Sequence, residues 1–180
     1  KKMSKSTGNV VDPLEIIDEY GADALRFTNA AMASLGGVLK LDMKRIEGYR
    51  NFVTKIWQAS SYGDSQIDAF SATRGAEPPK ATLPLNRWII GEIAKLREEV
   101  DGAFEAYRFN DAANALYSFF WNSFCARYLE FTKPIFFADD QAAKDETQKT
   151  YAWAIDQALI LMHPIMPFVT EEIWNVTQGR

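Results

Sequence analysis

The sequence is poor in the residues that build disulfides, histidine-based metal sites and membrane spans. It contains a single cysteine, Cys125, and a single histidine, His163, in 180 residues. One cysteine cannot form an internal disulfide, and this usage is typical of a reducing, cytoplasmic compartment. A metal site or catalytic dyad that needs two histidines cannot be built from this chain, so we expect no metal. No uncharged apolar run reaches about 18 residues, so we expect no membrane span, and we expect no signal peptide.

The residues that are present suit a globular domain with an uneven charge distribution. Hydrophobic residues make up 47% of the chain and include 12 Phe, 7 Tyr and 5 Trp, enough for a sizeable core. The net charge of −4 argues against binding to nucleic acid. However, residues 1–60 contain nine Lys and Arg against seven Asp and Glu, whereas residues 61–180 contain eleven against seventeen. Local positive clusters determine phosphate binding more than total charge does, so the basic N-terminal third stays a candidate.

Hydrophobic periodicity predicts an all-α fold, an up-down helical bundle preceded by a short helical connector. We expect the connector at 1–41 and the bundle at 42–180, with a flexible linker at 63–83 that is rich in Gly, Pro and Ser. Asp12, Asp42 and Asp140 precede helical patterns, and Pro134 is expected to end the fourth long helix. The expected helices cover 13–20, 23–34, 42–62, 84–107, 110–132, 140–162 and 168–176. Residues 38–41 are expected to form either a short strand or an extended connector.

The first residues form a small cationic loop. Lys2-Met3-Ser4-Lys5-Ser6 is followed by Thr7-Gly8 and then by the N-cap of the first expected helix. A lysine ammonium acts as a compact point charge on phosphate oxygens, and small residues let the backbone approach closely. A loop of this kind that leads directly into a capped helix favours a polyphosphate site over a solvated tail.

The run KMSKSTGNVVDPLEIIDEYGADALRF, residues 2–27, resembles the second signature of class I aminoacyl-tRNA synthetases. The resemblance implies that Lys2 and Lys5 are catalytic and hold the ATP phosphates while an aminoacyl-adenylate forms, with Lys5 as the main contact. It also implies that Ser4 and Ser6 help Lys5 to bind ATP, accompanied by magnesium. The other signature of this family needs two histidines, so we expect the chain to be part of a longer enzyme and inactive alone. The Rossmann core and the editing domain would lie outside it.

Three later segments resemble the valyl branch of this family. They are RIEGYRNFVTKIWQAS (45–60), WNSFCARYLEFTKP (121–134) and HPIMPFVTEEIW (163–174). The resemblance implies a helical anticodon-binding domain whose partners are tRNA(Val) and the rest of a monomeric, cytoplasmic synthetase that joins valine to tRNA with ATP. Two alternatives stay open: the same region of the isoleucyl branch, and a helical interaction module without an RNA role.

Candidate tRNA-binding residues lie on the expected helix at 42–62. They are Lys44, Arg45, Arg50, Lys55 and Tyr62, where the cations would contact phosphates and the tyrosine would stack on a base. A solvated helix face is the alternative interpretation of the cations.

Other conspicuous residues are expected to be structural. The helical spacing of the aromatic stripe favours a buried face over a base-stacking platform. This stripe comprises Phe119, Phe120, Trp121, Phe124 and Tyr128. Cys125 is expected to be buried and unreactive, and His163 is expected to mark a bend.

Overall fold

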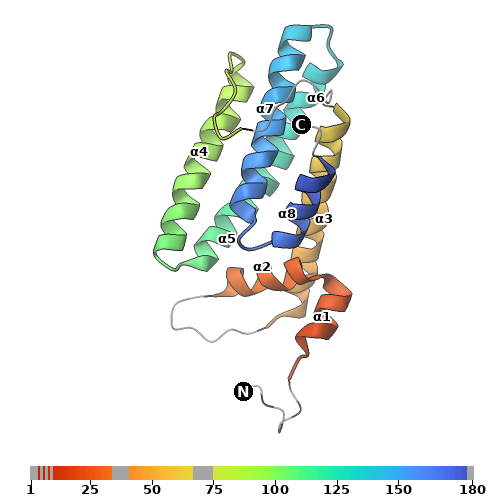
Figure 1. The fold of residues 1–180 in the computed structure, drawn as a ribbon, viewed down its shortest axis with the longest axis vertical. Coiled ribbons are helices and arrows are strands. Elements are labelled where there is room, and N and C mark those ends of the chain that lie inside the picture. The colour runs from red at the N-terminus through yellow and green to blue at the C-terminus, as the bar shows by residue number, and fades with distance from the viewer. Residues whose placement is uncertain are drawn as a thin grey trace.

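The computed structural model describes residues 4, 6, 8, 10–33, 41–66 and 75–177, and its regular elements in these ranges are all helical. Long helices run up and down in an elongated bundle, and α2 lies across its lower end (Figure 1). The expected all-α helical bundle is confirmed. The elements are α1 (Pro13–Tyr20), α2 (Ala22–Met32), α3 (Met43–Gln66), α4 (Pro84–Glu105), α5 (Phe109–Ser118), the π-helical η2 (Phe119–Leu129), α6 (Glu130–Phe137), α7 (Gln141–Met162) and α8 (Pro167–Val176).

Aspartates begin three of these helices as expected. The carboxylate of Asp12 accepts a hydrogen bond from the backbone N–H of Leu14 at 2.9 Å. The carboxylate of Asp42 accepts from the backbone N–H of Lys44 at 3.0 Å, and that of Asp140 accepts from the backbone N–H of Ala143 at 3.0 Å, which caps α7. Each bond satisfies one of the backbone donors that a helix start leaves without a partner.

The main core lies between α3, α4, α7 and the α5–η2 rod. Two buried tyrosines lie in it, and each has a hydrogen-bond partner on another helix. Tyr128 donates to the side-chain oxygen of Asn86 at 2.9 Å, and Tyr151 donates to the backbone carbonyl of Ala59 at 3.0 Å. These hydrogen bonds fix the orientation of the rings and leave neither buried hydroxyl without a partner.

Two charged side chains join α2 to the turn between α7 and α8. The buried carboxylate of Asp23 accepts from the backbone N–H groups of Phe168 and Val169 at 3.2 and 2.6 Å, which caps α8. Arg26 donates to the carbonyls of Pro164 and Ile165 at 3.0 and 2.9 Å. The connector helix is thus packed onto the bundle by specific polar contacts, although its assignment to a separate 1–41 segment stays a prediction.

The end of α3 differs from the expectation. This helix continues to Gln66 instead of stopping near Tyr62, so the first four residues of the expected linker are helical. Gly63, at the start of that expected linker, is a buried helical position against which the Tyr151 ring packs. Residues 67–74 and the expected strand or connector at 38–40 lie outside the described residues, and Leu41 is not part of a strand.

The prediction that Pro134 ends the fourth long helix is wrong. Pro134 lies inside α6, which continues to Phe137. A proline cannot donate to the preceding turn. The hydroxyl of Thr132 donates to the carbonyl of Leu129 at 2.8 Å, in the turn that precedes the proline. The proline follows a π-helical segment, where the backbone already departs from α-helical geometry.

Candidate nucleic-acid interface

The predicted cations of α3 lie on more than one flank of the helix. Lys44 and Lys55 are eleven residues apart, about three turns and roughly 16 Å along the axis, so they share a flank. Arg50 is rotated from Lys44 by about a third of a turn. The contacts agree with this geometry, because Lys55 reaches Trp121 of η2 whereas Arg50 reaches Tyr20 of α1. The five predicted residues therefore do not form one continuous surface.

Both arginines already have acidic neighbours. Arg45 lies 4.0 Å from the carboxylate of Asp42, and Arg50 lies 3.9 Å from that of Glu47, with all four side chains exposed. The guanidinium of Arg50 also lies 5.8 Å from the centre of the Tyr20 ring. Exposed ion pairs of this kind are weak, so phosphates can displace them at little cost. Lys44 is exposed and lies on the same flank of α3 as Lys55.

Lys55 is half-buried and lies over an aromatic pair. Its Nζ atom is 5.7 Å from the centre of the Trp121 ring. The rings of Trp121 and Tyr117 are nearly parallel, at 9° with centres 5.7 Å apart. The prediction that Trp121 belongs to the buried stripe is wrong, because it is 37% exposed. The rest of the stripe is buried as expected: Phe119, Phe120, Phe124 and Tyr128.

Tyr62 is less accessible than expected. The side chain is half-buried against the core, and its hydroxyl is buried without a hydrogen-bond partner. Burial raises the pKa of this phenol, while the nearby charge of Lys133 lowers it. The role of Tyr62 in base stacking stays a prediction.

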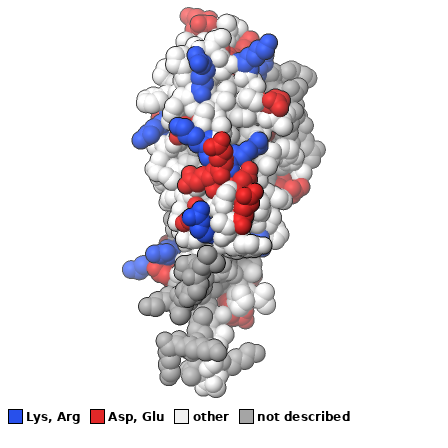
Figure 2. Space-filling view, turned by 90° about the vertical axis from the view of Figure 1, so that its left-hand side faces the viewer, with Lys and Arg blue, Asp and Glu red and all other residues white. Residues whose placement is uncertain are grey.

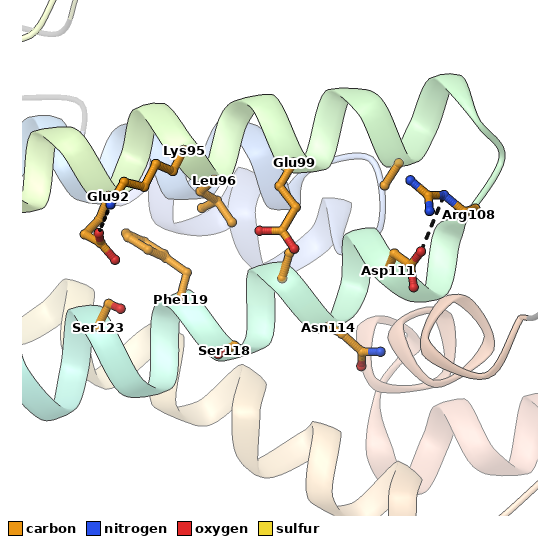
Figure 3. A pocket seen from close by; sticks show the side chains of 12 residues that line it. Glu92, Lys95, Leu96, Glu99, Arg108, Asp111, Asn114, Ser118, Phe119 and Ser123 are labelled. Carbon is orange, nitrogen blue, oxygen red and sulfur yellow. Dashed lines mark hydrogen bonds and ion pairs between the residues drawn. The ribbon is translucent and has the colours of Figure 1, made fainter.

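The opposite side of the bundle has a different charge. The face that includes α4 shows acidic residues gathered near its centre, with basic residues around them (Figure 2). A groove of about 530 Å³ runs between α4 and the α5–η2 rod. Glu92, Glu99 and Asp111 line it with Lys95 and Arg108, which pair with Glu92 and Asp111 (Figure 3). Three carboxylates against two cations leave this groove net negative, so it is a poor phosphate site.

The predicted phosphate-binding loop is described only in part. The hydroxyl oxygens of Ser4 and Ser6 lie 3.0 Å apart, near the surface. Lys2 and Lys5 lie outside the described residues, so their phosphate contacts stay predictions.

The lone cysteine and histidine have structural surroundings. Burial raises the pKa of the Cys125 thiol to about 12, so the reactive thiolate is suppressed, as the sequence led us to expect. The Nδ1 atom of His163 lies 2.8 Å from the hydroxyl of Thr170, and the residue ends α7 at the bend. The described part of the chain contains no cluster of His, Cys, Asp or Glu arranged to hold a metal ion. None of its helices has the length and apolarity that crossing a membrane requires.

Comparison with known families identifies the bundle. Residues 86–180 match the anticodon-binding domain of tRNA ligases. The chain belongs to this family. Residues 1–42 match the class I tRNA synthetases of the isoleucyl, leucyl, methionyl and valyl group. Helix α3, which carries the predicted cations, lies between the two matched segments. Its role is therefore inferred from its own geometry and not from either family match.

Whole-chain relatives of this family are more specific. A valine–tRNA ligase from Ruegeria pomeroyi is 58% identical over 100% of the chain, and one from Bradyrhizobium diazoefficiens is 56% identical over 99%. The chain spans 18% of the length of each of these curated relatives. Such identity across all segments supports the valyl branch over the isoleucyl one.

Two solved structures share the fold. A leucyl synthetase from Agrobacterium radiobacter, in a complex titled LeuRS-tRNA-LeuAMS, matches with a TM-score of 0.76 at 20% identity, covering 98% of this chain and 21% of that one. Methionyl-tRNA synthetase from Mycobacterium tuberculosis matches with a TM-score of 0.78 at 21% identity, covering 97% and 35%. At this identity the likeness establishes the fold only.

Proposed function

We propose that the chain is the tRNA-binding region of a valine–tRNA ligase. The observation that carries this proposal is the 58% identity to such a ligase over the entire chain. The intact enzyme would activate valine with ATP as an adenylate and transfer it to tRNA(Val). Within it, this chain would supply the lysine loop for the leaving pyrophosphate and the bundle that holds the anticodon end of the tRNA.

The chemistry proposed for the loop is electrostatic. Lys2 and Lys5 would offset the negative charge that develops on the phosphates as the acyl-phosphate bond forms. Ser4 and Ser6 would donate hydroxyl hydrogen bonds to phosphate oxygens beside them. The magnesium ion expected with ATP would share that charge, in an enzyme that we place in the cytoplasm.

The contacts proposed for the bundle are first to the tRNA backbone. Lys44 and Lys55 share a flank of α3, and ammonium groups bind phosphates without reading sequence. Arg45 and Arg50 would add contacts on either side after exchanging their weak carboxylate partners for phosphates. A module without an RNA role does not account for the match of the bundle to the anticodon-binding family.

Amino-acid-dependent pyrophosphate exchange tests the substrate. We expect the full-length enzyme that contains this chain to exchange pyrophosphate with valine far more efficiently than with isoleucine, and to bind tRNA(Val) more tightly than the same tRNA with a changed anticodon. A preference for isoleucine would move the chain to the isoleucyl branch. Equal affinity for both tRNAs would contradict the role of the bundle in anticodon binding.

A further inference from the structure

Trp121 lies at the surface beside the predicted phosphate contact. It combines an exposed indole, a nearly parallel Tyr117 ring and the ammonium of Lys55 at 5.7 Å. We propose that Trp121 stacks on an unpaired nucleobase of the bound tRNA, and that Lys55 covers this ring only in the free protein. This inference rests on the proposed function, because it takes tRNA as the ligand.

The aromatic pair is held rigidly from beneath. The Tyr117 ring packs against Phe52 with centres 4.7 Å apart and meets Tyr49 edge-on at 6.0 Å. Phe52 is fully buried in the core. A ring already fixed by its neighbours loses little freedom when a ligand binds, so the platform is preorganised for stacking.

The backbone under Trp121 is also unusual. Trp121 is the third residue of the π-helical segment Phe119–Leu129. π-helical turns are rare and occur frequently at functional sites, because they displace side chains from the positions that an α-helix would give them. Here the indole reaches the surface, whereas its neighbour Phe120 is fully buried.

The relative strengths favour exchange of the lysine for a base. An ammonium over an exposed ring contributes about two- to fivefold in an equilibrium constant. A base stacked on an aromatic ring contributes about 5- to 150-fold in affinity. The long flexible stem of Lys55 lets its ammonium move from the ring to a nearby phosphate, so one exchange provides both contacts.

Trp57 provides a matched control. It is exposed to a similar extent, at 41%, and lies on α3 only two residues from Lys55. However, it shares its hollow with Asp64 and with residues of α8, away from η2. Among the described residues, its surroundings therefore lack the cation and the stacked ring that distinguish Trp121.

The test measures tRNA(Val) binding by the full-length enzyme at fixed salt. We expect Trp121→Ala to weaken binding by about 5- to 150-fold and Trp121→Phe by less than about fivefold, because a smaller ring still stacks. Trp57→Ala and Trp57→Phe should change affinity by less than about twofold. We also expect the tRNA to quench indole fluorescence in the wild type, and most of this quenching to disappear in Trp121→Phe.

The outcomes separate this inference from the proposed function. If Lys44→Ala weakens binding but Trp121→Ala does not, the stacking role is overturned while the interface stands. If neither variant weakens binding, the interface on α3 is overturned as well. If Trp121→Phe retains the full quenching, the indole serves packing alone. The same conclusion follows if the weaker binding of Trp121→Ala is explained by a matching loss of folded protein.

Discussion

Gly63 shows that a glycine can occupy a position either because a loop favours it or because a packed helix leaves no room for a side chain. In sequence it marks a loop, but in the structure it is a buried position of α3 where the Tyr151 ring lies against the backbone. An added Cβ would collide with this ring, which the hydroxyl bond to Ala59 holds in place. Gly48 lies on the same helix, and a Cβ added there would have nothing within 4 Å. Gly63 therefore tests the steric requirement for glycine, and Gly48 tests only the low helix propensity of glycine.

We expect opposite effects of alanine at these two positions. Gly63→Ala should lower the free energy of unfolding by about 1–3 kcal/mol, because the core must shift to admit the methyl group. Gly48→Ala should raise it by about 0.5–1 kcal/mol, because alanine loses less backbone entropy in a helix. Urea denaturation followed by circular dichroism measures both changes. Stabilisation by Gly63→Ala would show that the packing of the Tyr151 ring does not require a glycine at this position.

Helix α4 obtains its N-terminal cap from a distant element. Its preceding residue, Leu83, has no side chain that can cap. The carboxylate of Glu146, on α7, accepts instead from the N–H groups of Thr82 and Leu83 at 3.0 and 2.9 Å, from the Thr82 hydroxyl at 2.6 Å and from Asn86 at 3.0 Å. Burial alone would raise the pKa of Glu146, but these hydrogen bonds outweigh it and lower the pKa to about 2.

This cap predicts a specific acid sensitivity. The pKa of Glu146 falls from 4.5 to about 2 on folding, so its contribution to stability is complete above about pH 4.5 and is lost as the pH falls towards 2. Glu146→Gln should lower the free energy of unfolding at pH 7 by about 1–2 kcal/mol, because water screens part of the charge. The difference between variant and wild type should shrink when denaturation is repeated at pH 3.

The control for this prediction is Glu105→Gln, which changes an exposed carboxylate in the last turn of α4. It should leave stability within about 0.5 kcal/mol of the wild type at both pH values. If the difference in the free energy of unfolding between Glu146→Gln and wild type is the same at pH 7 and pH 3, the role of the ionised carboxylate is contradicted.

Local signals in the sequence predict elements better than the contacts between them. Asp12, Asp42 and Asp140 are recognisable as caps because a cap and its helix are adjacent in sequence. The caps from Glu146 and Asp23 escape prediction, because their partners are more than 60 residues away. No local pattern reveals such a pairing.

The α5–η2–α6 rod reads as one helix in sequence because its apolar spacing is nearly helical. Periodicity does not reveal the π-helical segment, in which a small change in residues per turn decides which side chains face the core. The expectation that Trp121 lies in the core assumed α-helical spacing, whereas the expectation that Pro134 ends the helix came from the donor that proline lacks; both are wrong. The fold was therefore predictable, whereas the exposed aromatic of the candidate interface was not.

At the scale of the molecule, charge is distributed by face and not only along the chain. The sequence predicts a basic N-terminal third but does not show that its cations divide between two flanks of α3. Nor does it show that acidic side chains concentrate on the face of α4 and the groove beside it (Figure 2). If the proposed function holds, we expect the tRNA backbone to approach the α3 flank, because the groove beside α4 is net negative and disfavours phosphates.

Salt dependence tests this asymmetry. Each phosphate contact releases counterions, so Lys44→Ala and Lys55→Ala should each reduce the slope of log affinity against log salt by about 0.7–0.9. Lys95→Ala removes an equal charge from the acidic groove, where Lys95 pairs with Glu92 at 3.0 Å. We expect it to leave the slope unchanged in titrations of tRNA(Val) with the full-length enzyme from about 50 to 200 mM salt. If all three lysines lower the slope equally, net charge rather than the α3 flank governs binding, and the proposed orientation of the tRNA is wrong.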